Sequence, residues 1–232
     1  MRGLLRPFFL GAVLCSLVAV PAFAVQGLIM DWAPDSYGWE TDYNSVTHMS
    51  AAGSQLTVVG KIDVFYDPFL DLDPNTTEYT FIFKDLISLG SMDLGGIILT
   101  SYAGGLFEIW EDPSNNADFG ENPPNATSPS TFTDGTLVME GFLAGFELLG
   151  FVGPGGFSAT YSADFEFTGP VGGELYGRVE GCYGTTGGGW TDNTALVPLG
   201  YDFVVDGHLT VDDCRPTSTE SSNWGSIKGM FR

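Results

Sequence analysis

Strict alternation of apolar and polar residues is the feature that most limits what this chain can fold into. In segment 161–167 the odd positions are Tyr, Ala, Phe and Phe, and the even positions are Ser, Asp and Glu. Segment 203–211 shows the same spacing, with Phe203, Val205, Leu209 and Val211 on one parity. A period of two places each apolar set on one face of a β-strand. No sustained helical periodicity accompanies it, and 32 glycines and 13 prolines disfavour a helical fold.

Similar stretches separated by Gly, Pro, Asn and Asp predict about nine or ten strands in all. Besides the two segments above, strands are expected at 27–32, 54–66, 78–89, 95–103, 105–111, 136–151 and 173–181. They predict an all-β fold, an antiparallel two-layer sandwich of jelly-roll type. A closed outer-membrane barrel is the alternative, although such a chain normally ends in an aromatic strand and this one ends in Arg232.

Two segments and one strand depart from the regular pattern. Residues 111–131 and 184–198 are rich in Gly, Pro, Asn and Asp, and both are expected to be long surface loops. Segment 136–151 is apolar on both parities. A strand of that kind lies in the middle of a layered structure or at an interface.

The first 24 residues have the three parts of a cleavable secretory signal. Arg2 and Arg6 provide the positive charge, residues 7–20 are almost entirely apolar, and Ala22 and Ala24 place small residues before a cut. The apolar run is shorter than the ~18–20 residues of a spanning helix. We therefore expect cleavage after Ala24 and a secreted, cell-surface or periplasmic protein with no membrane span.

The remaining chain is expected to form one β domain, residues 25–214, followed by a tail, residues 215–232. The tail begins with a polar linker, and Trp224, Ile227 and Phe231 then recur at spacings of three and four. A short amphipathic segment of this kind needs a surface to dock on. That surface is either its own domain or an export or surface-assembly factor.

The acidic balance of the chain restricts its partners. The formal net charge is −21, which would repel nucleic acid and anionic membranes. Cations, neutral glycans and other surface proteins remain as partners. Two cysteines follow the signal, Cys182 and Cys214, and an even count in an exported chain predicts a disulfide between them.

Two groups of oxygen-bearing side chains are candidate calcium sites. Asp71, Asp73 and Asn75 match the first ligands of an EF-hand loop, but Thr76 replaces the required glycine, which excludes an EF-hand. An irregular calcium site remains open, against the alternative of a solvated acidic turn. The same two interpretations apply to a second group in the loop at 111–131, which includes Asp112 and Asp118.

Aromatic residues favour a glycan-binding module as a second function. Trp32, Tyr37, Trp39 and Tyr43 lie close together among polar neighbours, and Trp190 follows three glycines. Exposed rings there would stack on sugars, whereas buried rings would only cap the core. Catalytic motifs are absent: His48 has no recognisable nucleophile nearby in the sequence, and His208 lies on a polar parity.

A glycosidase is a third hypothesis, which needs two facing carboxylates. The candidates are Glu108, Glu111, Glu166 and Glu174, although a chain with 29 acidic residues offers many such pairs. The leading expectation is instead a non-catalytic, extracellular or cell-surface structural or adhesive protein.

The run Thr131-Phe-Thr-Asp-Gly-Thr-Leu-Val-Met-Glu-Gly141, with the upstream Phe107-Glu-Ile-Trp-Glu-Asp-Pro113, resembles a group of exported bacterial β-proteins. These are similar to the bodies of proteins that carry a PEP-type C-terminal sorting tail. The resemblance covers residues 54–180 and implies residence at the surface or in the extracellular matrix. The chain lacks the Pro-Glu-Pro triplet and apolar helix of that tail, so sorting by that route is not expected.

Overall fold

The computed structural model describes residues 27–120, 130–154, 156–193 and 195–214, and almost all of its regular structure is antiparallel sheet. Nine strands form the main sheet of the described residues. They are β1 (Gly27–Glu40), β4 (Gln55–Phe65), β5 (Glu78–Asp93), β6 (Ile97–Ala103), β7 (Leu106–Asp112), β8 (Thr136–Gly153), β9 (Gly156–Gly169), β10 (Cys182–Thr191) and β11 (Phe203–Cys214).

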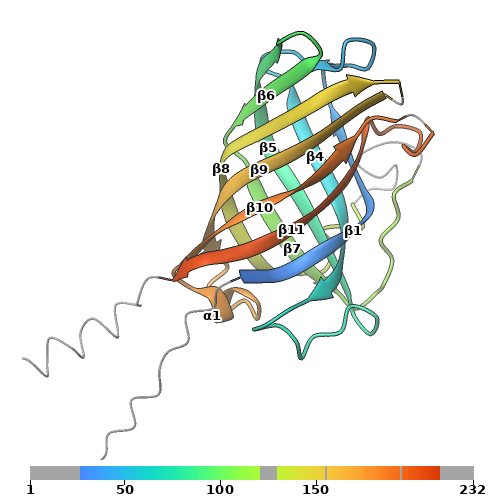
Figure 1. Ribbon diagram of the computed structural model, residues 1–232. Helices are drawn as coiled ribbons and strands as arrows, with labels where there is room; N and C mark the ends of the chain where they lie inside the picture. Colours follow the sequence, from blue (N-terminus) through green and yellow to red (C-terminus); the bar gives the residue numbers. More distant parts are fainter. Residues whose placement is uncertain (1–26, 121–129, 155, 194, 215–232) are drawn as a thin grey trace, which may run out of the picture.

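The sheet closes on itself. β1 pairs with both β4 and β11, and β4 pairs in turn with β5. The long strand β5 pairs with β7 along its first half and with β6 along its second half, and β8 does the same from the other side. Figure 1 shows the resulting cylinder of tilted strands, in which the described part leaves no long strand with an unpaired edge.

Aromatic rings fill the interior. Trp32 of β1 lies 5.0 Å from Phe81, 5.9 Å from Phe83 and 5.5 Å from Phe107, measured between ring centroids. Phe107 also contacts Phe165 of β9 at 5.6 Å, so rings from facing strands meet across the core. The alternation in β9 decides this arrangement, because its odd residues are buried and its even residues are exposed. The apolar face of the sheet therefore points inward, and these rings pack against one another in the core.

Both ends of the cylinder are covered. At one end lie the short helix α1 (Tyr176–Val179) and the segment before β5, which bury Val179, Leu175 and Phe69 in the core. At the other end a small hairpin, β2 (Tyr43–Asn44) and β3 (Met49–Ser50), packs its partly buried Tyr43 and Met49 against the core. Among the described residues, no helix has the length and apolar character needed to cross a membrane.

The prediction of an all-β antiparallel fold with two facing layers is confirmed. The connections are mostly a meander: each long strand pairs with the next one along the chain except β6 with β7, and β11 returns to pair with β1. The sheet can close because β4 pairs with both β1 and β5, and β8 pairs with β9 on one side and with β6 and β7 on the other. These pairings join the two layers at their edges.

One strand lies where a loop is expected. Residues 173–181, predicted as a strand, contain α1, and β10 instead occupies much of the predicted loop 184–198. Glycine weakens an isolated strand, but here it admits close neighbours. A Cβ at Gly184 would lie 1.8 Å from the carbonyl oxygen of Thr210, and one at Gly188 would lie 1.9 Å from that of Asp206. The glycines that suggested a loop are therefore required by the pairing of β10 with β11.

The predicted disulfide is confirmed. Cys182 and Cys214 are bonded and lie directly opposite each other at the paired ends of β10 and β11, with a Cα–Cα distance of 3.8 Å. The bridge is compatible with an extracellular or periplasmic protein. The predicted signal, residues 1–24, and the predicted tail with Trp224, Ile227 and Phe231 lie outside the described residues.

Candidate functional site

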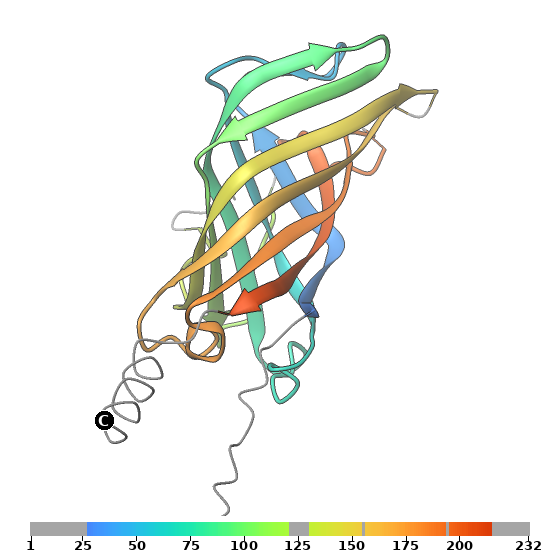
Figure 2. The ribbon, with the colours of Figure 1, turned by 60° about the vertical axis from the view of Figure 1, so that its left-hand side comes forward.

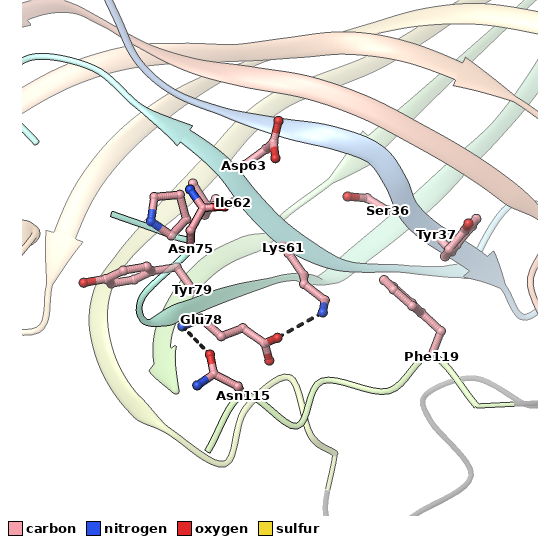
Figure 3. A pocket seen from close by; sticks show the side chains of 11 residues that line it. Ser36, Tyr37, Lys61, Ile62, Asp63, Asn75, Glu78, Tyr79, Asn115 and Phe119 are labelled. Atoms are coloured by element: carbon pink, nitrogen blue, oxygen red, sulfur yellow. Dashed lines mark hydrogen bonds and ion pairs between the residues drawn. The ribbon is translucent and has the colours of Figure 1, made fainter. Parts of the chain in front are cut away.

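A groove of about 510 Å³ on the outer surface combines aromatic and polar side chains, and we call it the β1–β4–β5 groove. Its floor is the outer face of β4 and β5, and the segments on either side of it belong to β1 and to the chain before β5 and after β7 (Figure 3). It is lined by Ser36, Tyr37, Lys61, Ile62, Asp63, Pro74, Asn75, Glu78, Tyr79, Asn115 and Phe119.

A bulge in β1 creates one wall of the groove. Trp32 pairs with Ile62 and Tyr37 pairs with Val59, so five steps along β1 span only three steps along β4. The extra residues bend β1 outward. The side chain of Ser36 turns onto Gly60, where a Cβ would lie 2.1 Å from the Ser36 Oγ. The chain therefore needs a glycine at position 60 to allow this bulge.

The loop after β7 forms the opposite wall and carries an aromatic ring to the groove. Phe119 meets Tyr37 edge-on at a centroid distance of 4.8 Å and meets Phe132 at 5.0 Å. The hydroxyl of Tyr201 donates a hydrogen bond to the Phe119 carbonyl at 2.7 Å. Burial, with a smaller effect from Asp118, raises the pKa of Tyr201 to about 12, so this donor remains protonated at neutral pH. The two rings of the groove are therefore held in place by a small aromatic cluster outside the main core.

The polar floor of the groove is centred on an ion pair. Lys61 Nζ lies 2.9 Å from Glu78 Oε1, and the two side chains are 44% and 10% exposed. The other carboxylate oxygen of Glu78 accepts a hydrogen bond from the Ala117 backbone N–H at 2.9 Å. The Glu78 backbone N–H in turn donates to the Asn115 side chain at 3.0 Å, as Figure 3 shows. Glu78 thus ties the loop to β5, while Lys61 keeps part of its ammonium group available to the groove.

The groove offers a ligand the rings of Tyr37 and Phe119 and a mixed set of donors and acceptors. Lys61 and the amides of Asn75 and Asn115 supply donors, and Asp63 and Glu78 supply acceptors. The ammonium of Lys61 is balanced by the carboxylate of Glu78. This arrangement is suited to a neutral, hydroxyl-rich molecule that stacks on rings and exchanges hydrogen bonds in both directions.

The residues proposed for the first calcium site separate in the structure. Asp71 forms a bidentate pair with Arg178, and this pairing lowers the pKa of the Asp71 carboxyl below its usual range. Asp73 accepts hydrogen bonds from the backbone and side chain of Asn75, and the backbone bond is the larger cause of its lowered pKa. These acids therefore hold an arginine and a turn, and Asn75 reaches the groove.

The second proposed calcium group is also occupied by its own loop. Asp112 is buried and accepts a hydrogen bond from the Ser114 N–H at 2.7 Å. Asp118 accepts one from the Gly120 N–H at 2.9 Å. No three His, Cys, Asp or Glu side chains converge on a metal-sized space within the described ranges.

The prediction that Trp32 and Trp190 are exposed sugar-binding rings is wrong. They are 1% and 3% exposed, because each points into the closed sheet and packs on phenylalanine rings. Trp39 lies on the outer surface, partly buried against Tyr201 at a centroid distance of 5.8 Å, in the aromatic cluster behind the groove. Of the rings that line the groove, Tyr37 belongs to the aromatic group expected to bind glycans, whereas Tyr79 and Phe119 do not.

The candidate glycosidase carboxylates engage different partners on different elements. Glu108 of β7 pairs with Lys84 at 2.6 Å, Glu174 lies 3.2 Å from Arg178, and the Glu166 carboxylate of β9 accepts a bond from Tyr183. His208 is exposed on the outer face of β11, as its parity predicts.

A buried polar cluster at the hairpin end was not predicted. The Asp192 carboxylate accepts hydrogen bonds from the Tyr43 hydroxyl at 2.6 Å and from the Phe157 N–H at 2.9 Å, and it contacts His48 Nδ1 at 2.5 Å. The three partners come from positions far from 192 in the sequence. Their only sequence signal is the concentration of polar residues around Tyr43, which by itself resembles any solvated turn.

Comparison of the chain with models of known families, with curated proteins and with solved structures gives no match in any of the three.

Proposed function

We propose that this chain is an exported, non-catalytic protein that binds its surroundings through its outer surface. The packed interior supports the proposal: the rings of Trp32, Phe81, Phe83 and Phe107 occupy the space in which a closed sheet would otherwise hold a ligand. Binding is then left to the outer face and the loops. The disulfide and the resemblance to exported surface β-proteins favour a structural or adhesive role outside the cytoplasm.

The β1–β4–β5 groove favours a neutral glycan as the bound molecule. Tyr37 and Phe119 are fixed before any ligand arrives, so stacking on them costs little ordering entropy. The Lys61–Glu78 pair and the two asparagines present donors and acceptors to hydroxyl groups. The net charge of −21 disfavours acidic polysaccharides and leaves uncharged ones.

Affinity electrophoresis of the full chain in gels that contain laminarin, xylan or galactomannan tests the proposal. At least one of these neutral polysaccharides is expected to retard the protein. The variant Tyr37→Ala is expected to weaken retardation about tenfold, the effect of losing a stacked ring with its apolar contact area. Phe142→Ala is the matched control, since it removes a half-exposed ring on β8, outside the groove.

Two results would contradict the proposal. Equal retardation of the Tyr37→Ala and Phe142→Ala proteins, both shown by melting curves to be folded, would remove the groove as the binding site. Release of reducing sugar from the same polysaccharides would show that the protein is a hydrolase.

A further inference from the structure

Large apolar side chains are exposed on several loops and strand ends at the hairpin end of the cylinder. Because the strands are antiparallel, the β2–β3 hairpin, the β5–β6 and β8–β9 turns and the β10–β11 loop all lie at this end. The exposed large apolar residues of these loops and of the end of β8 are Val46 (86%), Leu94 (57%), Phe151 (58%), Val152 (44%), Leu196 (59%) and Leu199 (76%). We call these six residues the apolar tips.

The apolar surface continues from the tips down the outer face of the sheet. Met92 of β5 lies opposite Leu99 of β6, which lies opposite Leu149 of β8. Ile97 lies opposite Phe151 in the row nearer the tips. Met92 and Leu149 are about half exposed. Cross-strand neighbours are close enough for their side chains to touch, so these residues form a continuous patch.

This patch explains part of the reason why β8 is apolar on both parities. The parity that faces the core changes at the irregularity between Ala144 and Glu147, with Leu143 buried before it and Phe146 and Leu148 buried after it. Beyond this point the other parity carries Leu149 and Phe151 to the outside. The sequence pattern left open a strand in the middle of a layered structure or one at an interface. Its outward residues have no protein layer over them in the described part. The position in the middle of a layered structure is therefore excluded, and β8 is a strand at an interface.

Charge distinguishes between the three possible partners of this patch, which are an anionic surface, a second copy of the chain and an uncharged surface. The three basic residues of the described part, Lys61, Lys84 and Arg178, belong to the middle of the sheet or to the opposite end, so nothing at the tips attracts an anionic surface. A second copy would bring two chains of net charge −21 together, with Asp93 and Glu147 beside each patch. A surface with no net charge needs no basic residues to attract it and is not repelled by the acidic chain.

Shape points to the same occupant. Figure 2 shows the β5–β6 hairpin and the ends of β8 and β9 projecting as separate fingers. Separate apolar projections fit poorly against a rigid protein face, but each enters a fluid layer independently. We propose that the apolar tips insert into the surface of a zwitterionic lipid bilayer and hold the protein there without spanning it. This inference is independent of the proposed glycan groove.

Sedimentation of the full chain with phosphatidylcholine vesicles tests the proposal. The protein is expected to pellet with the vesicles, and replacing part of the lipid with phosphatidylglycerol is expected to reduce binding. The double variant Leu94→Ser/Phe151→Ser is expected to lower the partition coefficient at least tenfold. The matched control Leu70→Ser/Val171→Ser removes two exposed apolar residues at the opposite end and is expected to bind as the wild type.

Three outcomes would overturn the proposal. The first is wild-type protein that stays in the supernatant of phosphatidylcholine vesicles. The second is a control variant that loses as much binding as the tip variant. The third is a dimer in sedimentation equilibrium that Leu94→Ser/Phe151→Ser dissociates, because the tips would then be covered by a second copy.

Discussion

Replacing Asp192 tests how the end of the cylinder is closed. Its side chain is buried at the end of β10 and receives the Tyr43 hydroxyl, His48 Nδ1 and the Phe157 N–H within 2.9 Å. Tyr43 and His48 belong to the small hairpin, whereas Phe157 belongs to β9. Burial, followed by the hydrogen bond to Asp192, raises the pKa of Tyr43 far above its usual value, so its hydroxyl remains a donor. A single carboxylate therefore fastens the hairpin to the main sheet.

The expected loss on Asp192→Ala is about 3 kcal/mol in the free energy of unfolding. A hydrogen bond to a charged group contributes roughly 1.5–3 kcal/mol. Three such bonds would sum to more, but the hairpin lies at the surface, and water can reach Tyr43 and His48 once it loosens. The Phe157 N–H is buried and bears the larger share of the cost. For a chain of this size, 3 kcal/mol lowers the melting temperature by roughly 6–12 °C.

Two further variants separate the hydrogen bonds from the loss of a charge. Asp192→Asn keeps an oxygen acceptor for the Phe157 N–H, so its loss is expected to be about half that of alanine. Asp164→Ala removes an exposed carboxylate on β9 and is expected to change stability by less than about 0.5 kcal/mol.

Urea unfolding at pH 7 gives the three free energies, and amide hydrogen exchange shows where the structure opens. Faster exchange in residues 41–54 than in β9 is expected for Asp192→Ala, because the hairpin detaches before the sheet unfolds. Equal free energies of unfolding for Asp192→Ala and Asp164→Ala would show that the Asp192 carboxylate does not hold the hairpin on the main sheet. That result would refute the reasoning from its three contacts.

Two further predictions concern packing and pH. Gly141→Ala places a Cβ 2.0 Å from the buried ring of Phe165 and is expected to lower the free energy of unfolding by about 2 kcal/mol. Gly177→Ala is the control in the same urea titration: its Cβ meets nothing within 4 Å, so it is expected to be neutral or slightly stabilising. Burial raises the pKa of Glu40 above its usual value, so its contribution to stability is present in acid and is lost as pH rises through the raised pKa. Glu40→Gln keeps an acceptor for Ser50 and is expected to flatten this part of the stability–pH curve, and a curve as steep as that of the wild type would contradict it.

Local rules predicted most of the sheet because its alternation is strong. The strands around Phe165 and Leu209 were recognised from period two alone, since a half-buried strand requires that pattern. The disulfide followed from the cysteine count. The same rules failed for β10, where three consecutive glycines before Trp190 resembled a loop. Their strand conformation depends on β9 and β11, which approach too closely for side chains.

The candidate site was predicted less well than the fold. Asn75 was singled out and does line the groove, but as a neighbour of Lys61 and not as a calcium ligand with Asp71. The polar sequence neighbours of Trp32 predict an exposed ring, but its side chain faces the core from β1. Tyr37 has almost the same sequence context and remains outside, because it lies on the opposite parity of β1 from the buried Trp32 and Ser36.

The sequence by itself determined the class of structure, since alternation, turn residues and composition act over a few residues and are visible without a partner. It also determined the acidic surface and the pairing of Cys182 with Cys214. Only the tertiary structure decided that the sheet closes and that aromatic rings fill its interior. It also decided that Glu78 pairs with Lys61, that Asp192 binds the hairpin and that the exposed leucines lie together at one end. Those features depend on residues separated by tens of positions along the chain. Their proximity is set by strand register and bulges, which a local pattern does not encode.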